Sequence, residues 1–116
     1  MIAGSPFLAL FVPGNRPERF AKAASSGADA IVIDLEDAVP PSERSSARDA
    51  VLTALRACER PPCEVCVRLN SSGTDDFVLD LALMEQLPEW AGLMLAKAET
   101  ADEMDFVGNR LPGRFR

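Results

Sequence analysis

The string Asp34-Leu35-Glu36-Asp37 places three carboxylates within four residues, directly after an apolar run. Carboxylates at this spacing can bind a hard divalent cation, directly or through its water molecules, or they can fix an arginine side chain. By strand alternation Asp34 and Glu36 are expected on one face, whereas Asp37 begins the following loop. A solvated loop whose acids interact with a helix dipole is the alternative. Because the acids continue a buried strand, a functional role is favoured.

Arg68 lies within the otherwise apolar segment Val65-Cys-Val-Arg-Leu-Asn70. A buried arginine is costly unless it is paired, and its planar guanidinium matches a carboxylate bidentately. Arg68 could bind the carboxylate of a substrate, pair with Glu36 to hold the strand ends, or do both. We predict that its guanidinium lies within salt-bridge reach of Glu36 or Asp37.

Basic residues follow two other apolar runs. A desolvated Lys97 could form a Schiff base, but Glu99 nearby favours the charged lysine and hence an ion pair. Arg16, Arg19 and Lys22 surround a helix start, where free N–H groups favour phosphate. The chain has no glycine-rich phosphate motif, so an ordinary solvated helix is the alternative for these three residues.

All of these polar residues follow apolar runs that predict strands. The strands are expected over 7–12, 30–33, 64–69 and 92–96, and the helices over 17–26, from 41 to about 58, over 74–87 and over 100–110. Strictly alternating units of this kind predict an α/β fold with a parallel sheet. The spacing fits a small doubly wound sheet or half of a (β/α)8 barrel, which needs about 250 residues. Both folds place functional residues at the carboxyl ends of the strands.

The amino-acid composition and net charge exclude several classes of protein. The 116 residues include 12 Lys and Arg against 18 Asp and Glu, so the net charge is −6, and 47% are hydrophobic. These values predict one folded domain and give no electrostatic reason to bind nucleic acid or an anionic membrane. With no His and no Tyr, imidazole and phenol chemistry are excluded. The first apolar run is too short for a signal peptide or a spanning helix, so a cytoplasmic protein is expected.

The three cysteines do not predict a metal or redox site. Cys63 and Cys66 have C-x-x-C spacing, but residues three apart on a strand point to opposite faces. Together with Cys58 they are expected to be buried or incidental thiols.

Four strings carry a family resemblance. They read LFVPGNRPERF over 10–20, DAIVIDLEDAV over 29–39, VRLN over 67–70 and LAKAE over 95–99. In this order they resemble the HpcH/HpaI aldolase/citrate lyase family, in particular its citrate lyase beta-subunit-like branch. The resemblance implies that residues 1–116 are a partial domain: four consecutive βα units that form the N-terminal half of a (β/α)8 TIM barrel, without strands five to eight.

The resemblance also implies a function. Family members are Mg²⁺-dependent carbon–carbon lyases that cleave or form a bond next to a 2-oxo acid or a CoA thioester such as malyl-CoA or citramalyl-CoA, and they associate as trimers or hexamers. By motif, Arg68 resembles the arginine that binds the substrate carboxylate, with Glu36 beside it in catalysis. Glu36 and Asp37 resemble the acidic pair beneath the metal. Arg16, Arg19 and Lys22 resemble basic residues near the CoA phosphates.

The metal ligands implied by the family do not fall in this chain. The resemblance places the two direct Mg²⁺ ligands, a Glu and an Asp, on the fifth and sixth strands, after Arg116. We therefore expect the chain alone to be at best a very poor lyase. The alternatives are a truncated, non-catalytic remnant that acts only by association, and a small α/β domain that binds an anionic ligand.

Overall fold

Four parallel strands form one sheet in the residues that the structure, a computed structural model, describes: 7–96 and 101–114. The strands are β1 (Ala9–Pro13), β2 (Ala30–Asp34), β3 (Glu64–Leu69) and β4 (Ala91–Leu95), paired in chain order. Between and after them lie η1 (Pro17–Arg19), α1 (Phe20–Ala24), η2 (Pro41–Glu43), α2 (Arg44–Ala57), α3 (Asp75–Gln86) and α4 (Ala101–Arg110). The predicted α/β class of consecutive βα units is confirmed.

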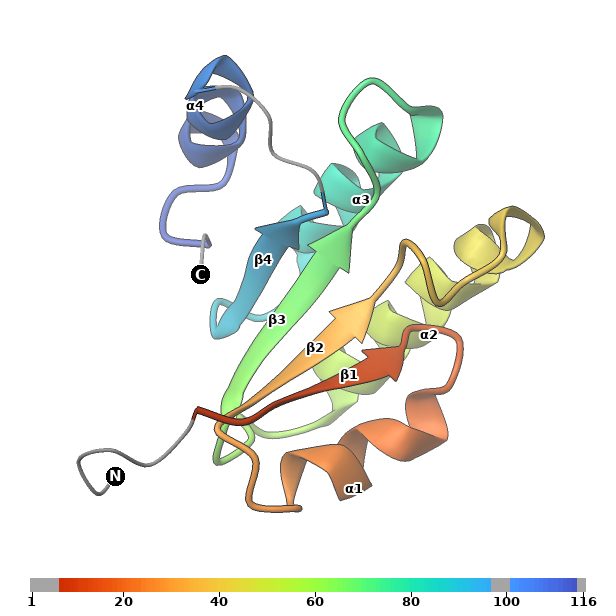
Figure 1. The fold of residues 1–116 in the computed structure, drawn as a ribbon, viewed down its shortest axis with the longest axis vertical. Helices are drawn as coiled ribbons and strands as arrows, with labels where there is room; N and C mark the ends of the chain where they lie inside the picture. The colour runs from red at the N-terminus through yellow and green to blue at the C-terminus, as the bar shows by residue number, and fades with distance from the viewer. Residues whose placement is uncertain (1–6, 97–100, 115–116) are drawn as a thin grey trace.

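Figure 1 shows the four arrowheads at one edge of the sheet, so the carboxyl ends of the strands lie together. In that view α2 and α3 lie behind the sheet, α1 runs beside β1, and α4 lies beyond β4. None of the helices within the described ranges is long and apolar enough to cross a membrane.

Alternate strand residues pack against the helices and form the core. The strands contribute Val12, Ile31, Ile33, Val65, Val67, Leu69 and Leu93, and the helices contribute Phe20, Val51, Leu55, Phe77, Leu81 and Met84. Residues Phe77, Leu81 and Met84 lie at helical spacing on one face of α3 and are buried, as is Leu87 at its C-cap. In α2 the buried face consists of Ala47, Val51 and Leu55, whereas Cys58 lies past the helix end and is exposed.

Local residue chemistry explains the ends of the helices. The predicted helix over 17–26 is a 3-10 turn opened by Pro17 and followed by the short α1, and Gly27 after it has a φ of 92°. The α3 helix begins after Thr74, whose hydroxyl accepts a hydrogen bond from the Phe77 N–H at 3.1 Å. This N-cap satisfies one of the free donors of the first turn.

Gly14 brings the ends of β1 and β2 close together. Its N–H donates to the Asp34 carbonyl at 2.8 Å. A Cβ at this position would lie 2.8 Å from Leu35 Cδ2 and 3.0 Å from the Asp34 carbonyl oxygen. A side chain at this position would force Leu35 and the Asp34 carbonyl to move, so glycine favours this close approach of β1 to the end of β2.

β1 and β4 are the edge strands of the sheet, but the outer edge of β4 is not fully open. The Leu93 N–H donates to the Arg114 carbonyl at 2.6 Å. The Arg114 guanidinium donates to the carbonyls of Leu87, Pro88 and Ala91 at 2.8–2.9 Å. The chain after α4 thus returns alongside β4, and its arginine binds the free carbonyls at the end of α3.

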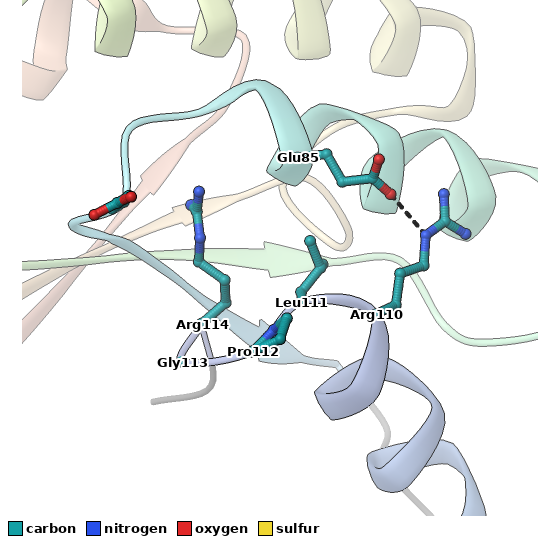
Figure 2. Close-up of a pocket in the computed structure, with 7 residues that line it drawn as sticks. Glu85, Arg110, Leu111, Pro112, Gly113 and Arg114 are labelled. Carbon is teal, nitrogen blue, oxygen red and sulfur yellow. Dashed lines mark hydrogen bonds and ion pairs between the residues drawn. The ribbon is translucent and has the colours of Figure 1, made fainter.

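A pocket of about 560 Å³ lies beside this returning segment (Figure 2). It is lined by Glu85, Arg110 and the residues around Arg114, and Arg110 Nε donates to Glu85 Oε1 at 2.7 Å. The pocket lies near the start of β4 and therefore away from the carboxyl ends of the strands, where Asp34 and Arg68 lie.

The β1 edge exposes large apolar side chains. Phe7, Leu8 and Phe11 are 63%, 51% and 55% exposed, and within the described residues β1 pairs only with β2. An unpaired apolar edge invites association. We expect the 116-residue chain to self-associate, with a molar mass by light scattering that rises with concentration.

A charge on the edge should oppose this association. Leu8→Lys is expected to shift the chain toward the monomer, whereas Leu79→Lys, at a comparably exposed position on α3, should leave the mass unchanged. A wild-type chain that stays monomeric from micromolar to near-millimolar concentration would contradict the prediction.

Candidate functional site

Arg68 and Asp34 form a bidentate ion pair at the carboxyl edge of the sheet. They are direct partners in the register of β2 and β3, on the face opposite the helices because Ile33 and Val67 point into the core. Arg68 Nε donates to Asp34 Oδ1 at 3.0 Å, and Arg68 Nη2 donates to Asp34 Oδ2 at 2.6 Å. The Asp34 side chain is 3% exposed and that of Arg68 is 21% exposed.

Both oxygens of Asp34 also accept backbone hydrogen bonds. Oδ1 accepts from the Glu36 N–H at 2.8 Å and Oδ2 from the Ala38 N–H at 3.1 Å. Burial disfavours the charged carboxylate, but these bonds and Arg68 outweigh it, so the pKa of Asp34 is lowered. Asp34 therefore ends β2, turns the chain and orients Arg68 at the same time.

Asp37, one of the two predicted partners of Arg68, lies farther from it than Asp34 does. Asp37 Oδ2 is 3.9 Å from Arg68 Nη2, which meets the predicted reach only at its limit, and its side chain is 72% exposed. The hydrogen bond to Asp34 is the main reason that the pKa of Arg68 is raised, and the charges of Asp34, Glu36 and Asp37 add to it. The expectation that Glu36 continues the strand is wrong, because β2 ends at Asp34.

The principal partner was missed although its signal was present in the sequence. Asp34 and Arg68 occupy the same place relative to the starts of their strands, as the register confirms. Aligning the two predicted strands would have paired them.

Phe11 of β1 supports the other side of Arg68. The guanidinium carbon lies 5.2 Å from the centre of the Phe11 ring, a cation–π distance. Arginine has five N–H donors, and the hydrogen bonds recorded for this side chain in the described part of the chain use two of them, on Nε and Nη2. Within the described residues Nη1 makes no hydrogen bond, while Asp34 and Phe11 hold the group in place.

Two of the three predicted phosphate-binding residues line one groove. A pocket of about 400 Å³ beside β1 is lined by Arg19, Lys22 and Phe11, together with Leu10, Val12, Pro13, Ala23 and Ser26. Phe11 therefore connects this groove to Arg68. Arg16 is exposed in the preceding turn and is not among the lining residues.

Two other groups of predicted residues remain. Lys97 and Glu99 lie outside the described residues. The cysteines are free thiols: Cys58 is exposed, Cys63 is half-buried and Cys66 is buried. Burial raises the pKa of the Cys63 thiol, which disfavours the reactive thiolate.

A buried polar network that the sequence analysis did not identify lies behind the end of β3. Asp80 of α3 is fully buried and accepts from the backbone N–H and the side-chain Nδ2 of Asn70, each at 2.8 Å. Its other oxygen accepts from Arg48 of α2 at 3.1 Å. Arg48 and Arg44 both donate to Asp76, one helical turn earlier, at 3.1 Å. The network joins α2, α3 and the residue two positions after Arg68.

Burial raises the pKa of Asp80, although Asn70 and Arg48 favour its charged form. Within the described residues, Asn70 Oδ1 and Arg44 Nε are buried without a hydrogen-bond partner. The available signal was an acid at position 80 on the apolar face defined by Phe77, Leu81 and Met84.

The described residues do not form a complete site for a divalent cation. They contain no group of three or more His, Cys, Asp or Glu side chains that could hold a metal ion. Both oxygens of Asp34 are already bound by Arg68 and by backbone N–H groups. A hard cation would need carboxylate oxygens from elsewhere.

Comparison with known proteins gives consistent results. The family model described as HpcH/HpaI aldolase/citrate lyase matches residues 8–112. A citrate lyase subunit beta-like protein of Mycobacterium tuberculosis is 41% identical over 95 residues, which cover 82% of this chain and 33% of the relative. The mitochondrial citramalyl-CoA lyase of Homo sapiens is 34% identical over 104 residues, which cover 87% of this chain and 30% of the relative.

A solved structure agrees in fold. The crystal structure of CitE from Mycobacterium tuberculosis in complex with magnesium, acetoacetate and coenzyme A superposes with a TM-score of 0.76 and 35% identity. The match covers 91% of this chain and 38% of that one. The chain thus spans about a third of the length of the curated relatives it matches.

Proposed function

Because the chain belongs to the HpcH/HpaI aldolase/citrate lyase family, we propose that it supplies the N-terminal part of a Mg²⁺-dependent carbon–carbon lyase. The reaction cleaves or forms a bond next to a 2-oxo acid or in a CoA thioester. The single observation that carries the proposal is the Arg68 guanidinium, held by Asp34 and Phe11 with N–H donors left for an anion. The proposal includes a cytoplasmic location and a homo-oligomer, a trimer or hexamer.

Arg68 would bind the carboxylate of the acid and orient it at the carboxyl edge of the sheet. A guanidinium whose position is fixed in advance stabilises negative charge that develops on a bound carbonyl compound, without reorganising during the reaction. Asp34 keeps the guanidinium in one orientation, and Phe11 packs against its face. In this proposal Glu36 and Asp37 lie beside the arginine and add to the negative potential that a cation would meet.

Magnesium, when bound, would supply Lewis-acid polarisation of the carbonyl group. The described residues do not by themselves fit this ion, because Asp34, the buried acid at the carboxyl ends of the strands, already has both oxygens bound. As the family resemblance implies, we assign the direct ligands to residues outside this chain, and we propose that Glu36 and Asp37 contact only the water around the metal.

The groove beside β1 fits the proposed CoA ester. CoA combines phosphates with an apolar arm, and the groove combines Arg19 and Lys22 with apolar residues of β1. Because Phe11 lines this groove and contacts Arg68, a thioester placed in the groove would direct its acyl end toward the arginine. Arg16, which is exposed, would contribute long-range attraction only.

Binding of pyruvate tests the role of Arg68. We expect pyruvate to shift the Arg68 Nε–H signal in a ¹⁵N-resolved NMR titration of the 116-residue chain. Arg68→Ala should weaken pyruvate binding at least about tenfold, because hydrogen bonds between charged groups contribute about 1.5–3 kcal/mol. Binding in the variant is followed by backbone amide signals near the strand ends.

Arg110→Ala is the matched control for this test. Arg110 is also an ion-paired arginine, but it lies beside Glu85, away from the strand ends. Its variant should bind pyruvate as the wild type does. Equal affinity of the wild type and Arg68→Ala would remove Arg68 as the anchor. Binding of many unrelated anions with equal affinity would favour a general anion-binding domain.

A further inference from the structure

We propose that Asp80 and Arg48 are a positioning pair that holds Asn70 and thereby fixes the orientation of Arg68 toward its ligand. The inference rests on the proposed function, because it names residues that act through the arginine of that site. It assigns a role to a buried network that lies outside the sheet edge and that makes no contact with the proposed substrate itself.

Asp80 completes the hydrogen bonding at the end of β3. The strand ends at Leu69, so the N–H of Asn70 lies one residue beyond it. The Asp80 carboxylate accepts that N–H and also the side-chain Nδ2 of Asn70, both on Oδ2 at 2.8 Å. One buried group on α3 therefore fixes both the backbone and the side chain of the residue two positions after Arg68.

Arg48 holds Asp80 in turn. Its Nη1 donates to Asp80 Oδ1 at 3.1 Å and to Asp76 Oδ1 at 3.1 Å, and its side chain is 12% exposed. The arginine comes from α2, so the carboxylate is fixed between two helices. Because Arg48 binds Oδ1, the Asp80 carboxylate is held in one orientation, and its Oδ2 atom faces Asn70.

Burying these charged groups costs more free energy than an apolar strand end would, so stability alone does not explain the arrangement. Apolar side chains would fill the same space without desolvating an acid and an arginine. Within the described ranges the Oδ1 atom of Asn70 is buried without a partner, because Nδ2 is directed to Asp80. Buried polar groups that lack hydrogen-bond partners are found mainly where a function requires a fixed geometry.

Arg68 is then held from three sides. Its carbonyl accepts from the Leu35 N–H at 3.0 Å, its side chain is bound by Asp34, and its chain continues into Asn70. Asp34 and Leu35 belong to β2 and the turn after it, whereas Asp80 belongs to α3. Without the anchor on α3, the neighbouring strands would still hold Arg68, but the residue two positions after it would lose its contact with the helices behind the sheet.

The experiment compares Asp80→Asn with Asp76→Asn. Asp76 lies one turn earlier on the same helix and shares Arg48, but within the described residues it accepts hydrogen bonds from Arg44 and Arg48 and not from Asn70. Both variants of the full 116-residue chain are measured by ¹⁵N NMR for two quantities. These are the rate at which the Arg68 Nε–H exchanges with solvent and the Kd of pyruvate.

We expect Asp80→Asn to weaken pyruvate binding about tenfold and to accelerate Arg68 Nε–H exchange, as loss of a supporting contact does at other sites. Asp76→Asn should stay within about twofold of the wild type in both quantities. Urea unfolding measures the stability of both variants. A general loss of stability would change the exchange rate and the Kd of each variant in proportion to its loss of unfolding free energy.

The outcomes distinguish the two proposals. If pyruvate does not bind the wild-type chain, the proposed function of this chain fails, whereas Arg68 Nε–H exchange still decides whether Asp80 positions the arginine. Equal exchange in Asp80→Asn and Asp76→Asn overturns the positioning role. If Asp80→Asn does not fold, Arg48→Lys takes its place. Lysine keeps the charge but not the fixed planar donor geometry. Arg48→Lys should therefore show faster Arg68 Nε–H exchange and weaker pyruvate binding than Asp76→Asn.

Discussion

Replacing Asp34 by alanine should lower the free energy of unfolding by about 3 kcal/mol, near the lower end of the range for breaking a buried ion pair. The change leaves the partly buried Arg68 without its bidentate partner. It also leaves the N–H groups of Glu36 and Ala38 without their acceptor. The measurement is urea unfolding followed by circular dichroism at 222 nm.

Asp37→Ala is the control for this loss. Its carboxylate is 72% exposed and lies 3.9 Å from Arg68, so its removal should change stability by less than about 0.5 kcal/mol. A loss at Asp37 as large as that at Asp34 would mean that the pair observed here is not the principal one in solution.

The contribution of Asp34 should also depend on pH. The pKa of Asp34 is lowered in the folded chain from the ordinary 3.8, so the folded structure stabilises the charged carboxylate relative to the unfolded chain. The stabilisation is therefore fully present above pH 3.8 and is lost as the pH falls through the folded-state pKa. The difference between wild type and Asp34→Ala should shrink in that acidic range and stay constant above it.

The largest expected effect concerns catalysis. We expect the 116-residue chain by itself to cleave malyl-CoA or citramalyl-CoA at least about 10³-fold more slowly than a full-length relative, because the electrostatic stabilisation that a bound metal supplies would be missing. Asp34 has both oxygens occupied, and the described residues hold no other cluster of metal ligands. Magnesium requires near-octahedral oxygen ligands and binds weakly to an incomplete set.

The assay follows thioester cleavage with Mg²⁺ and then with EDTA. The full-length citrate lyase subunit beta-like relative serves as the positive control for the substrates and the metal. Robust turnover by the chain that EDTA abolishes, and that Arg68→Ala also abolishes, would reverse the prediction. It would mean that copies of this chain assemble a complete site among themselves.

The order of strands and helices could be predicted from the sequence because it depends on local patterns. Short apolar runs bounded by proline and glycine predicted the four strands to within two residues at each end. Residues Phe77, Leu81 and Met84 of α3 recur with the 3.6-residue period that is typical of a buried helix face, and they are buried. The position of Arg68 at a strand end, beside an acidic string, followed from the same local pattern.

The partners of the charged residues were decided by the tertiary structure. Arg68 pairs with Asp34 rather than Glu36 because β2 ends at Asp34 and the register of β2 and β3 sets those two residues opposite each other. A shift of one residue in that register would place the acid on the other face of the sheet.

The buried network shows the same division. The sequence alone determined that α3 carries an acid, Asp80, within its apolar face, but it did not determine what would neutralise that acid. Arg48 and Asn70 lie 32 and 10 residues away along the chain, and only the packing of α2 against α3 beside the end of β3 brings them to it. Apolar periodicity is a property of each segment of the sequence. The pairing of buried charges depends on distances between segments, and those distances are set only when the chain folds.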